Sequence, residues 1–474
     1  MTVRHEAKTL NRTSAASSPA APVRMVHIGL GAFHRSHQAW YTEQADPDRR
    51  WGIAAFTGRS PEAAATLAAQ DGLYTLVERG DDGDEFSIVG SISAAHDGAD
   101  LARLTTLLSA PETALVTITI TEPAYHLGAD GRLNAASPAV AADAAALQEL
   151  RTAAGYLELR RNSPQLVTMG ARVLPGLDAR RRADAGPLAV VSCDNLTSNG
   201  EAASQAIQGL AALVSPELAD WIAGNVSFVN TSVDRITPRT TDADLAAVRE
   251  ATGFDDAAPV ITEPFSNWVL SGTFPAGRPA WENAGAVFVE DIAPFEQRKL
   301  WLLNGAHSLL AYAGQLRGLR TVADAVGDAA CTAELDAFWD EAAAHLDQPG
   351  LDIPAYRAAL LGRFRNARIE HLLEQIGADG STKLRMRAVP VLRAERSAGR
   401  TGEGAARAIA AWIDFLARRH DDGRAPADAE AGRLTGLLEL SGKDLTRGLV
   451  AVLDADLGAN AAVVDLVHSL RGSW

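Results

Sequence analysis

The chain has 474 residues, of which 47% are hydrophobic and 22% are charged, and its 59 acidic against 44 basic residues give a net charge of −15. This length predicts about two to three domains, and the composition is typical of a soluble globular protein. The acidic balance argues against nucleic acid as a partner, because binding to a phosphate backbone needs a basic surface.

The N-terminal residues 1–22 are rich in Ser, Ala and Pro and lack the apolar centre of a secretory signal, so we expect a flexible tail there. The two cysteines, Cys193 and Cys331, are too few for a disulfide framework or a zinc cluster. A reduced, cytoplasmic location is therefore expected. No apolar stretch approaches the ~20 residues that span a bilayer, so we expect no membrane partner.

A strand, a glycine turn and a helix open the ordered part of the chain. Residues 24–28 form a short apolar run, two glycines follow, and residues 32–45 are predicted to be helical. This order is similar to a dinucleotide-binding turn, in which the second glycine lets a pyrophosphate reach a helix N-terminus. A third glycine would stand at His34, so the fingerprint is incomplete. The predicted cofactor-binding residues of this turn are Gly29, Gly31, Ala32 and Phe33.

The second predicted strand, residues 51–56, bears on the choice of cofactor. An acidic residue after this strand holds the ribose of NAD, whereas an arginine pairs with the 2′-phosphate of NADP. Here Thr57-Gly58-Arg59-Ser60 follows, and the first acidic residue is Glu62. The cofactor is therefore predicted to be NAD or NADP, with a preference for NADP or use of both. The alternative is that Arg59 is merely solvated.

Three further apolar runs, residues 114–120, 188–192 and 226–230, are each followed by polar residues. Continuous apolar runs indicate parallel strands covered on both faces, and ligands bind at the carboxyl ends of such strands. At one of these ends Glu122 is predicted to contact the cofactor. A hairpin is expected within residues 73–92, around a Gly-Asp-Asp-Gly turn.

From about residue 291 the sequence turns helical, with predicted helices at 295–317, 324–346, 354–362, 364–376, 403–419 and 426–437. We therefore predict an α/β fold, with a Rossmann-type NAD(P)-binding domain at 23–290 and a mainly α-helical catalytic domain at 291–474. The cleft between two such domains is the expected active site. His34 and His37 have the spacing of metal ligands on a helix, but no Cys, Asp or Glu cluster accompanies them, so no metal is expected.

The segment FEQRKLWLLNGAH, residues 295–307, concentrates polar groups on one side of an apolar helix. At 100° per residue, four of its side chains fall within an arc of about 140°. They are Glu296, Lys299, Asn304 and His307. A buried lysine has a lowered pKa and can act as a base. The alternative to a catalytic lysine is a structural ion pair between Lys299 and Glu296. Gly305 inside the helix favours the catalytic interpretation, because a glycine there indicates the close approach of a ligand.

Several motifs together resemble one known family. They are VSFVNTSVDRITP at residues 226–238, SCDN at 192–195, the opening GLGAFHRSHQAWY, and Lys-x4-Asn-x2-His at Lys299, Asn304 and His307. Over residues 23–470 the chain is similar to the polyol-specific long-chain dehydrogenases, a family that includes mannitol 2-dehydrogenase and mannonate (fructuronate) oxidoreductase.

The resemblance implies roles for these residues in a metal-independent hydride transfer. Lys299 would be the general base that takes the hydroxyl proton, and Asn195 and Asn304 would donate hydrogen bonds to the developing alkoxide. His307 would orient the substrate, and Glu296 would connect Lys299 to solvent through water.

The resemblance also implies substrate contacts, and here the chain departs from the mannitol-type pattern. Val233, Asp234 and Lys383 match such contacts, but Gln375 stands where that pattern has an arginine. Ser271-Gly272 likewise replaces the usual Glu-Asp after Trp268-Val269-Leu270. Basic residues at 383, 385 and 387 are either a carboxylate-binding pocket or a solvated stretch.

The expected reaction is the NAD(P)-dependent oxidation of a polyol, as in D-mannitol to D-fructose, or the reverse reduction of a ketose. D-mannonate, arabinitol and mannitol 1-phosphate remain open as substrates, so a polyol, a ketose or a sugar acid is the expected small-molecule partner. A catalytically silent protein that binds a nucleotide or sugar is the non-enzymatic alternative. The sequence does not predict an oligomeric state.

Overall fold

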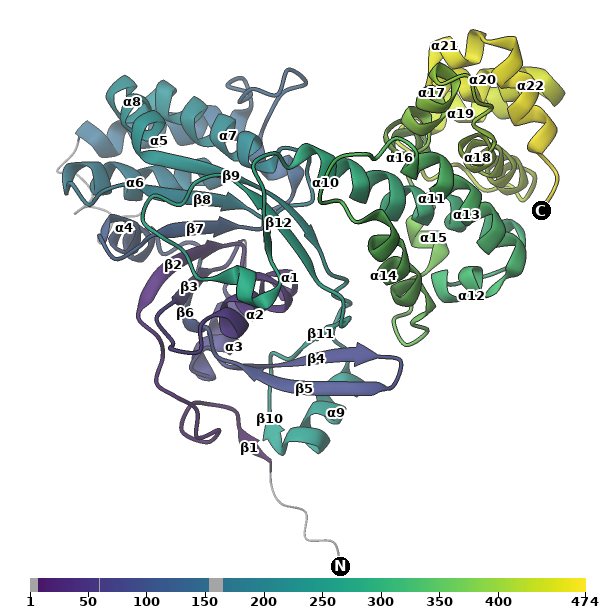
Figure 1. Cartoon of the computed structure of the whole chain (residues 1–474). Helices are drawn as coiled ribbons and strands as arrows, with labels where there is room; N and C mark the ends of the chain where they lie inside the picture. Colours follow the sequence, from purple (N-terminus) through teal and green to yellow (C-terminus); the bar gives the residue numbers. More distant parts are fainter. Residues whose placement is uncertain (1–6, 59, 153–164) are drawn as a thin grey trace, which may run out of the picture. The chain divides into compact units, whose positions relative to one another are not determined.

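The computed structural model describes residues 7–58, 60–152 and 165–474, and its chain divides into two compact units (Figure 1). Unit 1 is Met1–Ile292 and unit 2 is Ala293–Trp474. Unit 1 is an α/β unit built on an eight-stranded sheet, whereas unit 2 is helical. The predicted combination of a Rossmann-type fold with a mainly helical part is confirmed. Within the described ranges, no helix has the length and hydropathy needed to cross a membrane.

Six parallel strands form the centre of unit 1 in the order β6-β3-β2-β7-β8-β9. Their bounds are β2 (Val23–Ile28), β3 (Gly52–Phe56), β6 (Ile92–His96), β7 (Leu115–Ile118), β8 (Leu188–Ser192) and β9 (Val226–Asp234). Strand β12 (Asn267–Ser271) runs antiparallel to β9, and β13 (Val287–Phe288) follows it at the edge. The strand order reverses between β2 and β7, and in open α/β sheets such a switch point is where ligands bind.

Both faces of this sheet are buried under helices. Successive side chains of a strand point to opposite faces, so each strand contributes to both cores. Val26, Val116 and Val190 pack on one face, and their neighbours Met25, Leu115 and Val191 pack on the other. The first face is covered by α4 (Leu101–Ser109), α5 (Pro138–Thr152), α6 (Met169–Arg182), α7 (Asn199–Val214) and α8 (Pro216–Asn225) (Figure 1). The second is covered by α1 (Ala32–Ser36), α2 (Gln38–Ala45) and α3 (Glu62–Ala69).

The expectation of one helix over residues 32–45 is wrong, because the helix breaks at His37. The backbone of His37 has φ −119° and ψ −90°, outside the helical region. Its imidazole is buried against the rings of Phe33, Tyr41 and Trp268, and Nε2 lies 3.2 Å from the carbonyl oxygen of Asn267. Tertiary packing of one side chain thus overrides the local helical preference.

A smaller layer in unit 1 contains the predicted hairpin, β4 (Tyr74–Gly80) and β5 (Gly83–Val89), with β11 (Val260–Thr262) beside β4. A two-stranded sheet joins β1 (Lys8–Thr9) to β10 (Phe254–Asp255), which follows α9 (Asp242–Thr252). The expected flexible tail is therefore wrong for residues 7–22. Leu10 is fully buried, and the Arg12 guanidinium donates to the carbonyl oxygens of Gly90 and Ile92. Residues 1–6 lie outside the described part.

Unit 2 is built from helices around the packed pair α11 and α18. Their bounds are α10 (Ala293–Arg298), α11 (Gly305–Leu316), α12 (Val322–Gly327), α13 (Ala329–Ala343), α14 (Ile353–Arg365), α15 (Leu373–Ile376), α16 (Gly380–Arg387), α17 (Val389–Ser397), α18 (Glu403–Asp421), α19 (Ala431–Leu438), α20 (Gly442–Leu453), α21 (Ala455–Ala459) and α22 (Ala461–Leu470).

Three helix predictions in unit 2 are wrong in their boundaries. Residues 324–346 form two helices, because the Asp328 carboxylate accepts the Cys331 N–H at 2.9 Å and begins α13. Residues 364–376 are not one helix, since α14 ends at Arg365 and only the four residues of α15 follow. The helix expected from residue 426 begins at Ala431.

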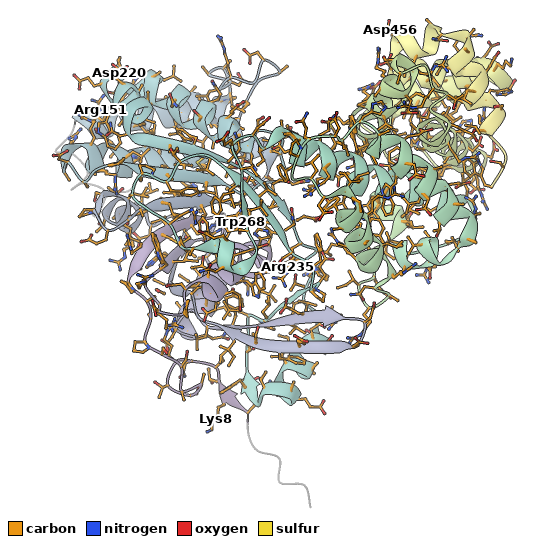
Figure 2. All side chains as sticks on the ribbon, in the orientation of Figure 1. Lys8, Arg151, Asp220, Arg235, Trp268 and Asp456 are labelled. Atoms are coloured by element: carbon orange, nitrogen blue, oxygen red, sulfur yellow. The ribbon has the colours of Figure 1, made fainter. Side chains whose placement is uncertain are left out.

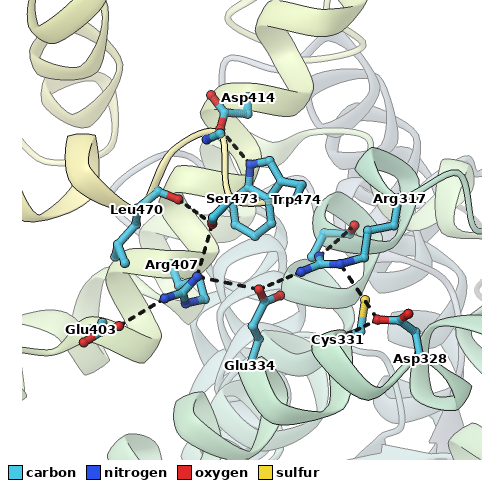
Figure 3. A network of polar contacts seen from close by, with 12 residues as sticks. Arg317, Asp328, Cys331, Glu334, Glu403, Arg407, Asp414, Leu470, Ser473 and Trp474 are labelled. Atoms are coloured by element: carbon cyan, nitrogen blue, oxygen red, sulfur yellow. Dashed lines mark hydrogen bonds and ion pairs between the residues drawn. The ribbon is translucent and has the colours of Figure 1, made fainter.

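A network of polar side chains in unit 2 joins its C-terminus to the helices (Figure 3). Arg317 forms an ion pair with Glu334 at 2.8 Å, and Arg407 bonds Glu403 at 3.0 Å. The indole N–H of Trp474 donates to the Asp414 carboxylate at 2.7 Å. Arg317 and Glu334 are largely buried, and their pairing is the usual condition for burying charge.

Candidate active site

Gly29 directly follows β2 at the switch point of the sheet, and its conformation requires glycine. Its φ is +108°, and a Cβ atom there would lie 1.9 Å from the carbonyl oxygen of Thr119, the residue after β7. Gly31 is different, because the nearest atom to its missing Cβ is the Gly29 carbonyl oxygen at 3.6 Å. Gly31 precedes α1 and no side chain caps that helix. Ala32 and Phe33 are half-buried in its first turn. The first N–H groups of α1 therefore have no side-chain cap.

Next to this turn the backbone is strained at Thr121, which has φ +83° and ψ 149°. A β-branched residue seldom adopts positive φ, and strain of this kind clusters at functional sites. The Asp194 carboxylate holds it in place, because one oxygen accepts the N–H groups of Ile120 and Thr121 at 2.8 Å each. The other oxygen accepts the Tyr125 hydroxyl at 2.6 Å. Asp194 is buried, and burial raises its pKa while these bonds oppose the shift.

Three predicted residues lie at the same edge of unit 1. Asn195 comes directly after Asp194 and is exposed. Val233 and Asp234 are buried at the end of β9, where the pairing of β9 with β8 has already ended at Val191↔Val229. The last residues of β9 pair with β12 alone, up to Asp234↔Asn267. The strand thus carries both side chains past the carboxyl edge of the parallel sheet, where ligands bind.

The predicted cofactor residues Arg59 and Glu122 differ in what the structure shows. Arg59 lies outside the described residues, and Glu122 is exposed at the start of a short 3₁₀ turn, Glu122–Tyr125.

A cation that sequence reasoning missed lies beside the end of β3. Arg172 of α6 donates to the Gly58 carbonyl oxygen at 2.7 Å. No local sequence signal connects Arg172 with residues more than a hundred positions away.

The histidine motif after the glycine turn is buried under it. His34 stacks on His27 with ring centroids 3.3 Å apart. The ring nitrogens of His27 lie 2.8 Å from Thr117 Oγ1 and 3.1 Å from Thr119 Oγ1. Burial lowers the pKa of His27 to about 3 and that of His34 well below its usual value. In the described ranges, no group of three His, Cys, Asp or Glu side chains is arranged to hold a metal ion.

In unit 2 the predicted catalytic segment is helical, but its middle is a π-helix, Lys299–Asn304, between α10 and α11. The Gly305 N–H donates to the carbonyl oxygen of Leu300, five residues earlier. The expected uniform spacing of 100° per residue is therefore wrong here. A turn closed by i→i+5 bonds brings residues five apart closer to one side than an α-helix does. Lys299 and Asn304 are five apart, and π-turns of this kind are frequent at functional sites.

Gly305 allows close packing of two helices, whereas the sequence had indicated a close approach of a ligand at this position. A Cβ atom on Gly305 would lie 2.6 Å from Cε1 of Phe338, so α13 packs directly on the helix backbone here. The indole N–H of Trp339 also donates to the Leu302 carbonyl oxygen at 2.8 Å. Helix α13 therefore covers the apolar side of the π-helical segment and fixes its position in unit 2.

The polar residues of this segment are not equally buried. Glu296, Lys299 and Asn304 are half-buried, so the expected full burial of the lysine is wrong. His307 is 9% exposed, and among the described residues its Nε2 has no hydrogen-bond partner. Its ring lies 4.9 Å from that of His371. Burial, followed by the positive charges around it, holds the pKa of His307 well below its usual value.

The basic residues of α16 separate into two groups. Arg385 forms an ion pair with Glu430 and donates to the Val452 carbonyl oxygen. Arg387 instead donates to the Asn304 carbonyl oxygen at 3.1 Å and to Ser308 Oγ at 3.0 Å, so it contacts the helix that contains the predicted catalytic residues.

Lys383 donates to the carbonyl oxygen of Ile376 at 3.0 Å, the last residue of α15. Gln375, the preceding residue of α15, is exposed. Unit 2 thus groups Asn304, His307, Lys383 and Arg387, while unit 1 groups the glycine turn, Thr121, Asn195 and Asp234.

A parallel sheet with a glycine turn at its switch point defines unit 1 as the dinucleotide-binding fold of an α/β oxidoreductase. Residues 23–283 match the mannitol dehydrogenase Rossmann domain, and residues 291–470 match the mannitol dehydrogenase C-terminal domain. The chain belongs to the mannitol dehydrogenase family. This confirms the family predicted from the sequence, and with it the class of enzyme, a dehydrogenase.

Named relatives have different substrates. D-mannonate oxidoreductase of Escherichia coli (strain K12) is 35% identical over 94% of this chain and 91% of its own length. D-arabinitol 4-dehydrogenase of Ralstonia nicotianae is 37% identical over 79% of this chain and 78% of its own. The structure of Pseudomonas fluorescens mannitol 2-dehydrogenase in a ternary complex with NAD and D-mannitol is 34% identical, with a TM-score of 0.76 over 99% of this chain and 94% of that one.

Proposed function

We propose that this dehydrogenase transfers a hydride between a nicotinamide dinucleotide and a secondary alcohol of a polyol, with Lys299 as general acid and base. The observation that carries the proposal is the π-helical turn, which brings Lys299 and Asn304 toward one side of the helix. Both are then available to the same substrate oxygen. Lys299 takes the hydroxyl proton during oxidation and returns it during reduction of the ketose.

Other groups stabilise the oxygen as it gains negative charge. In this proposal Asn304 and Asn195 donate hydrogen bonds to it, an arrangement that serves in place of a metal ion. His307 is neutral at physiological pH because burial depresses its pKa, so it orients the substrate as a hydrogen-bonding group and not as a charge. Glu296, half-buried one turn before Lys299, relays protons between Lys299 and solvent.

The dinucleotide supplies the hydride acceptor or donor when bound, and unit 1 holds the residues for it. Gly29, Gly31, Ala32 and Phe33 would hold its diphosphate, and Glu122 would lie near its reactive end. The residues that follow β3, Thr57 and Gly58, include no acid, and Arg172 donates to Gly58. Together with Arg59, this favours NADP, or use of both dinucleotides, although the solved mannitol 2-dehydrogenase is a complex with NAD.

We assign dinucleotide binding to residues 23–290 and substrate binding with catalysis to residues 291–474, with Val233 and Asp234 contributed by β9. The reference reaction is the oxidation of D-mannitol to D-fructose. Lys383 and Gln375 contact the substrate, and the positive charge of Arg387 beside Lys383 supports D-mannonate as the alternative substrate. Cys193 and Cys331 are buried free thiols, which fits a reducing compartment such as the cytoplasm.

A substrate panel tests the proposal. Absorbance of the reduced cofactor is followed with NAD(H) and NADP(H) against mannitol, arabinitol, mannonate, fructose and fructuronate. Turnover of at least one polyol, ketose or sugar acid is expected. Binding of cofactor without turnover of any of them contradicts the proposal and favours a silent nucleotide- or sugar-binding protein.

A further inference from the structure

Strand β9 extends beyond its parallel neighbour β8 at the carboxyl edge of the sheet. The pairing of the two strands ends at Val191↔Val229, and β9 continues to Asp234 beside β12. Thr231 is the next residue after Val229 whose main-chain N–H and C=O point toward the β8 side, because this direction alternates along a strand. Thr231 is buried, so both groups require a partner that β8 no longer provides.

The side chain of Asn199, the first residue of α7, supplies these partners. Its Oδ1 accepts the Thr231 N–H at 2.8 Å, and its Nδ2 donates to the Thr231 carbonyl oxygen at 2.7 Å. A carboxamide offers the same donor and acceptor as the main chain, so Asn199 takes the place of a further residue of β8. The Thr231 hydroxyl also donates to the carbonyl oxygen of Ser192, the last residue of β8, at 2.7 Å.

The same carboxamide holds the turn that follows β8. Nδ2 of Asn199 also donates to the Asp194 carbonyl oxygen at 2.8 Å. That oxygen belongs to the planar peptide unit between Asp194 and Asn195, so the bond fixes the plane from which the Asn195 side chain starts. Asn199 is fully buried, and its amide uses its donor and its acceptor groups in these bonds.

A reciprocal contact between α7 and β9 fixes the position of Asn199. Asn230 of β9 accepts the N–H groups of Gly200 and Glu201 on its side-chain oxygen, at 2.8 and 3.3 Å. Gly200 allows this close approach, because a Cβ atom there would lie 2.6 Å from the carbonyl carbon of Val229. Each element therefore bonds the main chain of the other through an asparagine, and such a satisfied network is rigid.

We propose that Asn199 is a positioning residue for the reaction, because it sets the main chain of Asn195 against the end of β9 that carries Val233 and Asp234. The inference rests on the proposed function, in which Asn195 donates to the reacting oxygen and β9 contributes polyol contacts. A misplacement of about 1 Å can lower a rate about 10²-fold, and loss of one oxyanion donor lowers it about 10²- to 10³-fold. Asn199 acts through these residues and not by contact with the substrate.

The kinetics of Asn199→Ala provide the first test. With the best substrate of the panel, we expect kcat to fall about 10- to 100-fold, by more than the Kd of the cofactor rises. Asn225→Ala is the matched control, because Asn225 directly precedes β9 at its other end and donates to the Trp221 carbonyl oxygen of its own helix. Its kcat should match wild type, and Tm reports that both variants are folded. Equal kcat in the two variants would overturn the proposal.

Asn199→Asp separates positioning from the start of a helix. An acidic residue in the first turn of a helix is favourable, so a residue that only begins α7 tolerates Asp. A carboxylate has the same shape and keeps the acceptor for the Thr231 N–H, but it places an acceptor against the carbonyl oxygens of Asp194 and Thr231. Asn199→Asp should therefore lower kcat at least as much as Asn199→Ala. Wild-type kcat in Asn199→Asp would overturn the proposal.

A double substitution tests whether Asn199 acts through Asn195. Asn195→Ala removes the donor itself, so adding Asn199→Ala to that variant should lower kcat by a smaller factor than it does in wild type. A residue with a general structural role would lower kcat by the same factor in both backgrounds. Equal factors would therefore overturn the assignment.

Hydrogen exchange separates this inference from the proposed reaction, because it needs no turnover. The peptide that contains the Thr231 N–H should exchange about tenfold faster or more in Asn199→Ala than in wild type or Asn225→Ala, since the acceptor is lost. Faster exchange in a protein that turns over no substrate would support the hold on β9 and contradict only the proposed function. Unchanged exchange in an active enzyme would overturn the positioning role alone.

Discussion

Two regions of the molecule, the carboxyl edge of the sheet in unit 1 and the side of α16 in unit 2, hold their buried polar groups in different ways. At the carboxyl edge of unit 1, the Asp194 carboxylate accepts two backbone N–H groups and the Tyr125 hydroxyl, so its bonding is complete. Arg235, labelled in Figure 2, is likewise enclosed by Glu78, the Trp40 ring and backbone oxygens. In unit 2, Arg387 and His307 keep buried nitrogens without partners among the described residues.

This difference distinguishes a polar network whose hydrogen bonds are complete from one that keeps unpaired donors. A satisfied network is rigid and fixes the backbone, as Asp194 fixes the strained Thr121. Unsatisfied buried donors cost free energy, so the bonds of Arg387 stabilise the fold less than a complete set would. The edge of unit 1 thus fixes the backbone, whereas α11 and α16 of unit 2 keep donors that are not fully bonded.

The largest expected effect concerns the base. Lys299→Ala should lower kcat by about 10²–10⁴, the usual contribution of general acid–base catalysis, with the Kd of the cofactor nearly unchanged. Steady-state kinetics and fluorescence titration with reduced cofactor measure the two quantities. Lys443→Ala, which removes an exposed lysine paired with Asp465, is the control and should behave as wild type. Near-normal kcat in Lys299→Ala would show that another group is the base.

Two buried arginines test the comparison directly. Arg180→Met should lower the free energy of unfolding by about 2–4 kcal/mol, because five carbonyl oxygens lose their donor. Arg387→Met should cost about 1 kcal/mol or less, since it breaks only two such bonds and relieves like-charge repulsion. Urea denaturation measures both, with exposed Arg103→Met as control. Equal losses would make Arg387 structural and would break the comparison.

Asp194 is expected to act as a positioning residue. In Asp194→Asn the amide group cannot accept all three bonds, so Thr121 is held less firmly and the neighbouring cofactor turn is disturbed. We expect about tenfold lower kcat/KM, with KM for the cofactor rising more than kcat falls. Asp220→Asn, on the exposed side of α8 (Figure 2), is the matched control. A loss of stability with unchanged KM for the cofactor would mean that Asp194 is structural alone.

The smallest effect is a dependence of stability on pH. Burial lowers the pKa of His27 to about 3 and those of His34 and His307 well below their usual value. Between the unfolded pKa of about 6.5 and the folded values, only the unfolded chain binds these protons, so stability falls as the pH falls. Tm should therefore decrease from about pH 7 to about pH 5. In His34→Gln the decrease should be shallower, and an unchanged slope would contradict this account.

The sequence by itself determined the fold class and most strands of the parallel sheet, and it predicts which side chains are reactive. Buried parallel strands need continuous apolar runs, so β7, β8 and the start of β9 are visible in the chain, and their polar successors mark the ligand edge. The motif around Lys299 likewise predicts hydride transfer with a lysine base, since one short segment contains amine, amide and imidazole groups at fixed spacing.

Only the tertiary structure decided how those side chains are held. The break at His37 comes from the packing of its ring, and α13 covers the π-helical segment at Lys299. Arg385 and Arg387 have different partners because each contacts a different helix that is distant in sequence. Local periodicity reports the preference of a segment for a regular helix or strand. Local periodicity does not predict which groups a buried atom will contact, because packing between segments far apart in the chain determines those partners.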